Sequence, residues 1–290
     1  MLFSNEKNEG RPTFSFEVFP PKKTGSVETI YDTLFALGEL EPDFISVTYG
    51  AGATVGDTLT CDMASMIKNR LGIESVVHLT CVNTTRNDAD IILKRLKEDG
   101  IDKILALRGD IVPGVEPLKE FEHASDLVTY IKAHGDFHVL GACYPECHYE
   151  CEDMVTDILN LKKKVDAGVE YLISQLFFDN EAFYSFLEKA RIAGIDVPIE
   201  AGIMPVTNTK QIKRMVSLCG ASLPAKFVRI MQRYENNPEA LRDAGIAYAA
   251  DQIIDLVANG VDGIHLYTMN NPYVARKIAE SVGNVIKVKL

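Results

Sequence analysis

The sequence predicts an α/β protein of the (β/α)8 barrel class, and three observations lead to this prediction. Eight short runs of apolar and β-branched residues recur along the chain and barely alternate with polar residues, as parallel strands buried on both faces do. Amphipathic segments that end near a glycine separate these runs, as helices do. Successive runs end about thirty residues apart, the length of one βα unit. Eight such units can close into a barrel, and an open doubly wound sheet is the alternative fold.

The predicted strands follow one another at the expected intervals along the chain. They lie at residues 13–20 (TFSFEVFP), 44–50 (FISVTYG), 75–81 (SVVHLTC), 103–110 (KILALRGD), 138–145 (HVLGACYP), 171–179 (YLISQLFFD), 199–206 (IEAGIMPV) and 263–270 (GIHLYTMN). Helical periodicity is clear at 88–101, 124–136 and 155–169. The last interval is about twice as long as the others, which predicts extra helices at 222–234 and 237–260 before the last strand. No Pro- or Ser-rich linker interrupts the pattern, so one domain over 1–290 is expected.

Composition limits the kinds of partner. A chain of 290 residues that is 47% hydrophobic can bury a large core. No secretory pattern and no apolar run of about 18 residues is present, which predicts a cytoplasmic protein without membrane contact. The net charge of −11 argues against nucleic-acid binding, although a local basic pocket could still hold an anionic small molecule. Six cysteines in such a chain are expected to be reduced thiols.

Polar side chains gather where the predicted strands end. A barrel enzyme has its active site at the carboxyl ends of its strands, so these side chains are candidates for the site, although loops following strands are polar for ordinary reasons too. They come from six strands and comprise Glu17, Thr48, His78, Thr80, Arg108, Asp110, Tyr144 and Gln175.

Glu17 is the most informative of these residues. It lies between Phe16 and Phe19 in FSFEVFPPK. Burying a carboxyl group among aromatic side chains costs free energy, which favours a functional role over a structural one. An apolar environment favours the protonated carboxyl, which suits a proton donor near neutral pH.

Two further motifs each allow a functional and a structural interpretation. In LALRGD, Gly109 permits close approach of a ligand to the backbone and leaves Asp110 at the rim beside Arg108, but the same residues could form a simple turn with an ion pair. Gln175 in ISQLFFD could recognise a heterocycle with mixed donors and acceptors, or it could satisfy polar groups of the core.

The stretch ACYPECHYEC at 142–151 has the residue types of a metal or redox site. Cys143, Cys147 and Cys151 stand four apart, unlike the CxxC pairs of structural zinc sites, and a fourth ligand would have to be His148 or a distant residue. We therefore expect no metal. Dinucleotide GxGxxG, P-loop, HExxH and GxSxG motifs are also absent.

The predicted helix after this stretch carries four polar residues on one face. Asp153, Asp157, Asn160 and Lys164 follow one another at spacings of four, three and four. Spacing alone favours a solvated face over a cofactor site.

Taken in order, the motifs resemble the flavin-dependent methylenetetrahydrofolate reductase family, in its bacterial form with the catalytic domain only. The matching pieces cover nearly the whole chain from Phe14 to Asn270. They are FSFEVFPPK, ISVTYGAG, HLTC, LALRGD, ASDLV, YPECH, DILNLKKKVDAG, SQLFFD, GIMPVTN and HLYTMN.

The resemblance implies a (β/α)8 barrel that binds FAD and reduces 5,10-methylenetetrahydrofolate to 5-methyltetrahydrofolate. By the family pattern, Glu17 is the general acid that opens the methylene bridge, and Asp110 lies near flavin and pterin and stabilises the cationic intermediate. Gln175 would hydrogen-bond the pterin and Gln211 would lie near the folate. The positions implied to line FAD are Thr48, His78, Arg108, Gly109, Asp110, His123, Ala124, Tyr144, His148, Asp157, Asn160 and Lys164.

Some positions depart from the family pattern. Asn271 replaces an arginine of enteric relatives, Met215 replaces a phenylalanine, and His123 replaces a common tyrosine. The electron donor is left open between NADH, NADPH and a partner subunit, and a homo-oligomer is expected. The alternatives are a folate- or corrinoid-associated binding subunit that needs a partner for electron input, and a metal-centre protein. The three cysteines near the flavin raise the hypothesis of oxygen sensitivity.

Overall fold

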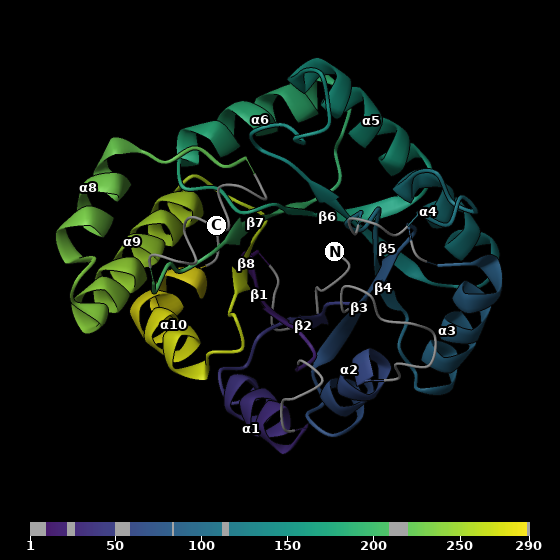
Figure 1. The fold of residues 1–290 in the computed structure, drawn as a ribbon, viewed down its shortest axis with the longest axis horizontal. Helices are drawn as coiled ribbons and strands as arrows, with labels where there is room; N and C mark the ends of the chain where they lie inside the picture. Colours follow the sequence, from purple (N-terminus) through teal and green to yellow (C-terminus); the bar gives the residue numbers. More distant parts are fainter. Residues whose placement is uncertain are drawn as a thin grey trace.

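The computed structural model describes residues 10–21, 27–49, 59–82, 84–111, 116–208 and 220–288, and in it eight parallel strands form a closed barrel (Figure 1). Each strand pairs with the next, and β8 pairs with β1. The barrel prediction is confirmed, and the open-sheet alternative is wrong because the ladder closes. The strands are β1 (Thr13–Val18), β2 (Phe44–Val47), β3 (Glu74–Thr80), β4 (Lys103–Leu107), β5 (His138–Cys143), β6 (Val169–Ser174), β7 (Ile199–Ile203) and β8 (Gly263–Tyr267).

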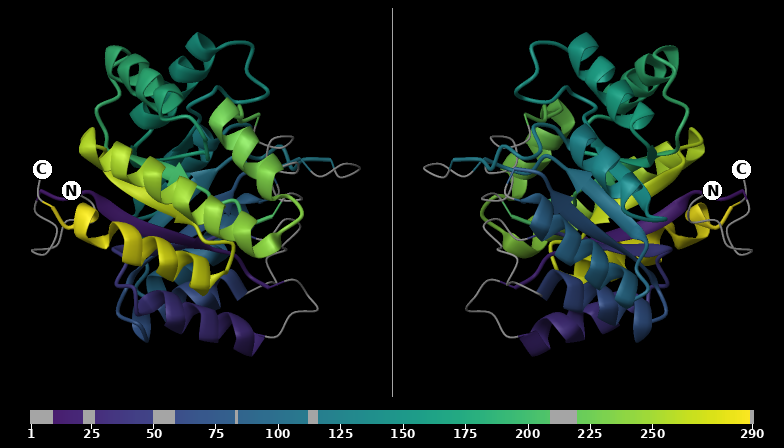
Figure 2. Two further views of the ribbon diagram at one scale, coloured as in Figure 1. Left: turned by 90° about the vertical axis from the view of Figure 1, so that its left-hand side faces the viewer. Right: turned by 90° about the vertical axis from the view of Figure 1, so that its right-hand side faces the viewer.

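Helices surround the barrel and return the chain from the carboxyl end of one strand to the amino end of the next (Figures 1 and 2). The predicted extra helices are confirmed as α8 and α9, and α8 lies outside the ring beside α9 (Figure 1). The described helices are α1 (Val27–Gly38), α2 (Leu59–Asn69), α3 (Arg86–Glu98), α4 (Ala124–Ala133), α5 (Met154–Asp166), α6 (Asn180–Ile192), α8 (Ala225–Tyr234), α9 (Pro238–Ala258) and α10 (Pro272–Ile286).

The largest hydrophobic core lies between the strands and the surrounding helices. Phe16, Val18, Ile45 and Val47 of β1 and β2 are fully buried in it. A second cluster around Phe227 of α8 packs this helix against the segments that follow β6 and β7. Apolar residues therefore alternate little with polar residues along these strands, because helices cover the outer faces of the strands and the inner faces are enclosed in the barrel interior.

The barrel interior has an apolar half and a polar half. The apolar half comes from β2 to β6 and consists of Phe44, Val76, Leu105, Leu140, Tyr171 and Ile173. The polar half comes mainly from β1, β7 and β8, and its side chains Thr13, Ser15, Glu200 and His265 are all buried. An uneven interior of this kind positions polar groups beneath only one side of the barrel mouth.

Gly263 has no side chain and so leaves space for the polar side chains of the barrel interior. It pairs with Thr13 on one side and Glu200 on the other. A Cβ atom at this position would lie 2.0 Å from Thr13 Oγ1 and 2.9 Å from Glu200 Oε1. Any larger residue must therefore displace one of these two side chains.

We predict that Gly263→Ala destabilises the protein by about 1–3 kcal/mol, the usual cost of overfilling a packed core. Gly283→Ala in α10 is the matched control, because its Cβ would have no atom within 4 Å. Replacing a glycine by alanine inside a helix typically raises the free energy of unfolding by about 0.5–1 kcal/mol. Urea denaturation of the two variants measures both effects, and equal stabilities would contradict the close packing around Gly263.

Candidate active site

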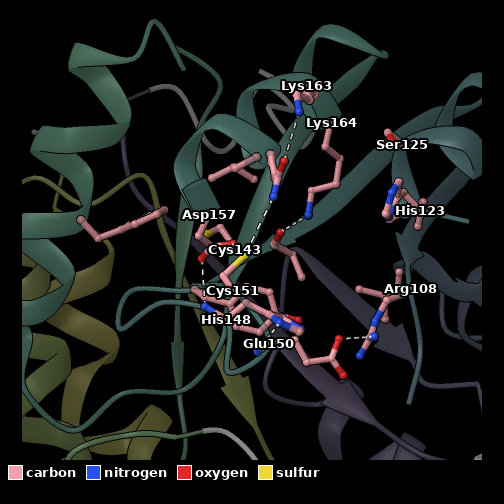
Figure 3. A pocket seen from close by; sticks show the side chains of 18 residues that line it. Arg108, His123, Ser125, Cys143, His148, Glu150, Cys151, Asp157, Lys163 and Lys164 are labelled. Carbon is pink, nitrogen blue, oxygen red and sulfur yellow. Dashed lines mark hydrogen bonds and ion pairs between the residues drawn. The ribbon is translucent and has the colours of Figure 1, made fainter. Parts of the chain in front are cut away.

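A cavity of about 320 Å³ opens beside the carboxyl ends of β4 and β5 (Figure 3). The start of α4 and one face of α5 complete its walls. Arg108 and His123 lie on one side, and Asp157, Cys151 and His148 lie on the other (Figure 3). Among the residues predicted to bind the cofactor, the cavity brings together Arg108, His123, Ala124, Tyr144, His148, Asp157, Asn160 and Lys164.

The cavity combines a positively charged side chain, Lys164, with the N-terminus of helix α4. Lys164 reaches back from α5 and donates a hydrogen bond to the backbone oxygen of Ala142, 2.5 Å away. Burial lowers the pKa of Lys164, and nearby Cys143 and Asp157 oppose this shift. The first residues of α4 also line the cavity, and backbone N–H groups at a helix N-terminus bind anions. The cavity therefore suits a phosphate-bearing ligand despite the negative charge of the whole chain.

Arg108 is held at the entrance by two residues of the loop after β5. Its guanidinium forms an ion pair with Glu150 and donates a hydrogen bond to the Tyr149 hydroxyl. Arg108 Nε is buried, with no hydrogen-bond partner among the described residues. One polar atom of the cavity wall thus remains available to a ligand.

His148 forms part of an aromatic wall. Its ring meets Tyr144 edge to face at 4.6 Å and stacks on Tyr149 at 4.7 Å. Its Nδ1 accepts a hydrogen bond from the backbone of Glu150. Burial and then the charge of Arg108 lower the pKa of His148, so its ring is neutral near pH 7. Within the cavity, the neutral rings of Tyr144 and His148 offer a surface on which a flat heterocycle can stack.

The four polar residues on one face of α5 have two different roles. Asp157, Asn160 and Lys164 line the cavity, whereas Asp153 caps the helix by accepting a hydrogen bond from the backbone of Thr156. Three of these four residues therefore face the cavity, although Asn160 is also exposed to solvent, because helix α5 packs with that face toward the cavity.

The cysteines of residues 142–151 are ordinary protonated thiols. Burial raises the pKa of Cys143 to about 12, and burial followed by the charge of Asp157 raises the pKa of Cys147 and Cys151. In the described part of the chain, no group of three His, Cys, Asp or Glu residues could hold a metal ion.

Glu17 lies apart from this cavity, inside the barrel mouth. Its side chain is 22% exposed, and its Oε2 lies 3.7 Å from His78 Nε2 and 3.9 Å from His265 Nε2. Burial lowers the pKa of His78 to about 4, which the charge of Glu17 opposes. His78 is therefore neutral at physiological pH and does not act as a fixed positive partner for Glu17.

The sequence analysis missed the polar residues beneath Glu17. Ser15 Oγ donates to Glu200 Oε1 at 2.9 Å and lies 2.6 Å from His265 Nδ1. The signal that could have found them is the period-two spacing of Ser15 and Glu17, which places both on the inner face of β1.

The other predicted residues lie around the same mouth. Thr48 follows β2, and its amide donates to Val18. Gly109 has a φ of 88°, and a Cβ there would lie 2.8 Å from Thr80 and Val82, so this glycine fits a tight turn. Asp110 is exposed beside it. The Oε1 atom of Gln175 accepts from the backbone of Leu176. Gln211 and Met215 lie outside the described residues.

Together these features define an enzyme of the (β/α)8 barrel class, with a carboxylic acid inside the barrel mouth and a basic, aromatic-walled cavity beside it. The family model described as methylenetetrahydrofolate reductase matches residues 2–283, and the chain belongs to this family. It catalyses the reduction of 5,10-methylenetetrahydrofolate to 5-methyltetrahydrofolate. The family is generally flavin-dependent.

Relatives of similar sequence agree with this assignment, and a solved structure shares the fold. The 5,10-methylenetetrahydrofolate reductase of Escherichia coli K12 is 38% identical over 275 residues, which cover 95% of this chain and 92% of that protein. Methylenetetrahydrofolate reductase (NADH) 1 of Arabidopsis thaliana is 35% identical and covers 97% of this chain and 50% of the plant protein. An uncharacterized Clostridium thermocellum protein that binds two copies of 5-methyl-5,6,7,8-tetrahydrofolic acid shares the fold, with a TM-score of 0.70, 16% identity and coverage of 97% of this chain and 98% of that one. None of the described helices is long and apolar enough to cross a membrane.

We predict that the three thiols near the cavity react slowly at pH 7, because the thiolate is the reactive form. In the protein without cofactor, alkylation followed by mass spectrometry should leave Cys143 unmodified until the chain unfolds. Cys147 and Cys151 should react more slowly than free cysteine. Asp157→Asn is expected to speed the reaction of both, since the charge of Asp157 raises their pKa. Rapid alkylation of all three would instead favour the oxygen-sensitivity hypothesis.

Proposed function

We propose that the chain binds FAD in the cavity beside β4 and β5 and uses it for folate reduction. The observation that carries this proposal is the gathering of eight residues, assigned to FAD only by resemblance, around one cavity. FAD, when bound, supplies the hydride for the reaction. The chain's own contribution is to bind the cofactor and the folate, exclude water and move a proton.

The chemistry of the cavity matches the parts of such a cofactor. Lys164 and the N-terminus of α4 suit the pyrophosphate, because both offer positive charge to phosphate oxygens. The rings of Tyr144 and His148 offer a surface for a flat heterocycle. Arg108 contributes a planar donor group, held in place by Glu150.

Glu17 is the proposed general acid. It lies within the barrel mouth, where its side chain is 22% exposed and its Oε2 lies 3.7 Å from the neutral His78. Asp110 at the rim would stabilise the positive charge that develops when the methylene bridge opens, an interaction that strengthens as water is excluded. Gln175 and Gln211 are proposed to contact the folate, Gln175 through the carboxamide that its bond to Leu176 orients.

NADH is the donor to test first, because the name of the Arabidopsis thaliana relative specifies it. NADPH and a partner electron-transfer subunit are the other donors compatible with this site. The second candidate is a folate-binding flavoprotein subunit that depends on a partner for its electrons. Anaerobic titration with NADH, NADPH and reduced ferredoxin separates these possibilities by showing which donor bleaches the flavin.

We predict that the purified protein is yellow and that Lys164→Met weakens FAD binding by about tenfold to a hundredfold, since a charge-assisted hydrogen bond contributes about 1.5–3 kcal/mol. Lys162→Met is the matched control on the same helix, because Lys162 pairs with Asp166 outside the cavity. Flavin fluorescence titration of the two apoproteins measures the difference. A colourless protein with no affinity for FAD would overturn the proposal.

We predict that Glu17→Gln keeps its flavin but reduces folate roughly 10²–10⁴-fold more slowly, the usual contribution of a general acid. Reduction of the flavin by the donor should be unchanged, because that half-reaction does not use the Glu17 proton. Stopped-flow absorbance of each half-reaction tests this. Full folate turnover in the variant would show that another group donates the proton.

A further inference from the structure

We propose that Glu200, buried inside the barrel, is a proton reservoir that reloads Glu17 through Ser15 and His265. This inference rests on the proposed role of Glu17 as general acid. It assigns a positioning and proton-storage function to three residues that do not reach the cavity or the substrate.

The four side chains form a column across the closing strands of the barrel, in which every link except the last, from His265 to Glu17, is a hydrogen bond. Glu200 Oε1 accepts from Ser15 Oγ at 2.9 Å, and Ser15 Oγ lies 2.6 Å from His265 Nδ1. On the other side of the ring, His265 Nε2 lies 3.9 Å from Glu17 Oε2 and 3.4 Å from Ser46 Oγ. Proton transfer to Glu17 therefore requires its carboxyl to approach the imidazole to about 3 Å, the length of a hydrogen bond.

Histidine and serine can carry a proton along this column without gaining a net charge. In one arrangement Glu200 is protonated and donates to Ser15, Ser15 donates to His265 Nδ1, and His265 Nε2–H faces the Glu17 carboxylate. Moving each proton by one bond gives the other arrangement, in which Glu17 is protonated, His265 carries its proton on Nδ1, and Glu200 is the carboxylate. One proton has crossed from Glu200 to Glu17, and no bond to a heavy atom has changed.

The surroundings of Glu200 suit a group that both holds and releases a proton. Its side chain is fully buried, and Oε2 has no hydrogen-bond partner among the described residues. Burial raises the pKa of Glu200 to about 7; His265, Ser15 and Thr13 lower it, and Asp43 raises it. Tyr171, whose hydroxyl lies 2.6 Å from Thr13 Oγ1, is the other titratable group facing this site. Burial therefore brings the pKa of Glu200 toward neutral pH, where the group can both accept and release a proton.

The reaction explains why a reservoir is useful. Each folate reduction consumes one proton from the general acid, which must be replaced before the next turnover. The Glu17 side chain is only 22% exposed, and ligands at the barrel mouth would shield it further from water. A carboxyl below the site can supply the proton while the mouth is covered. Once the mouth opens, solvent protonates Glu17, and the same shift in reverse returns a proton to Glu200.

A purely structural role for Glu200 has little physical support. An unpaired carboxyl oxygen in a core costs stability, and Gly263 must lack a side chain to accommodate this carboxyl. An apolar residue would fill the same space more cheaply.

The test is the rate at which methylenetetrahydrofolate reoxidises the dithionite-reduced holoenzyme, measured by stopped flow from about pH 5 to about pH 9. For Glu200→Gln we expect a rate near that of the wild type at the acidic end, where protons from solvent are most abundant. Near pH 7 we expect a loss on the order of tenfold, a fraction of what a general acid contributes. The loss should shrink again at the alkaline end, where Glu200 of the wild type is ionised.

Two further variants identify the cause. Ser15→Ala keeps both carboxyl groups but interrupts the column, so it should reproduce the loss near pH 7. An effect of Glu200 charge alone is recognised in Glu200→Gln itself, because that loss would grow rather than shrink at the alkaline end, where Glu200 of the wild type is ionised. Tyr171→Phe removes a hydroxyl from the far end of the network and should keep the wild-type pH profile.

The proposal is overturned if Glu200→Gln matches the wild type at every pH, or if it is slowed by the same factor at every pH. If Glu200→Gln fails to fold, the pH profile of Ser15→Ala tests the relay instead. A loss near pH 7 supports the relay, and a wild-type profile overturns it. A wild-type protein that binds no flavin or reduces no folate would instead refute the proposed function, and this outcome is recognised before any variant is made.

Discussion

Closure of the ladder between β8 and β1 is the constraint on which the rest of the site depends. This pairing sets Ser15 opposite His265 and Glu17 opposite Tyr267, although about 250 residues separate the partners along the chain. Because side chains alternate between the two faces of a strand, a slip of one residue would turn Glu17 and Ser15 outward into the apolar core. The same closure brings the carboxyl ends of all eight strands to one mouth, so residues from many strands can share a ligand.

The cavity beside β4 and β5 and the interior of the barrel differ in their electrostatics. The cavity beside β4 and β5 collects Lys164, Arg108 and a helix N-terminus in a chain whose net charge is −11, so the field that matters to an anionic ligand is local. Inside the barrel, charge is largely avoided instead. His78 is neutral, Glu200 Oε1 accepts hydrogen bonds from the hydroxyl groups of Thr13 and Ser15, and Ser15 Oγ lies 2.6 Å from His265 Nδ1. A proton can be stored in such an environment because no strong cation fixes the carboxylate.

Much of the fold could be predicted from the sequence because each βα unit has a strong local signal. The ends of the eight strands and the two added helices were found where apolar runs and helical spacing placed them. Glu17 stood out because a carboxyl among phenylalanines is costly. The face of α5 was harder to interpret, since spacing shows which residues share a face but not what that face contacts. Only packing beside β5 shows that Lys164 points inward while Asp153 caps the helix.

The sequence by itself therefore determined the kind of fold, the order of its units and the acid at the end of the first strand, because these depend on periodicity and on the cost of burying charge. The tertiary structure decided the neighbours of that acid. Glu200 and His265 lie in runs that read simply as buried strands, and nothing local pairs them with Ser15. Their meeting depends on the register and inward facing of strands joined only when the barrel closes, a long-range property that no short window of sequence contains.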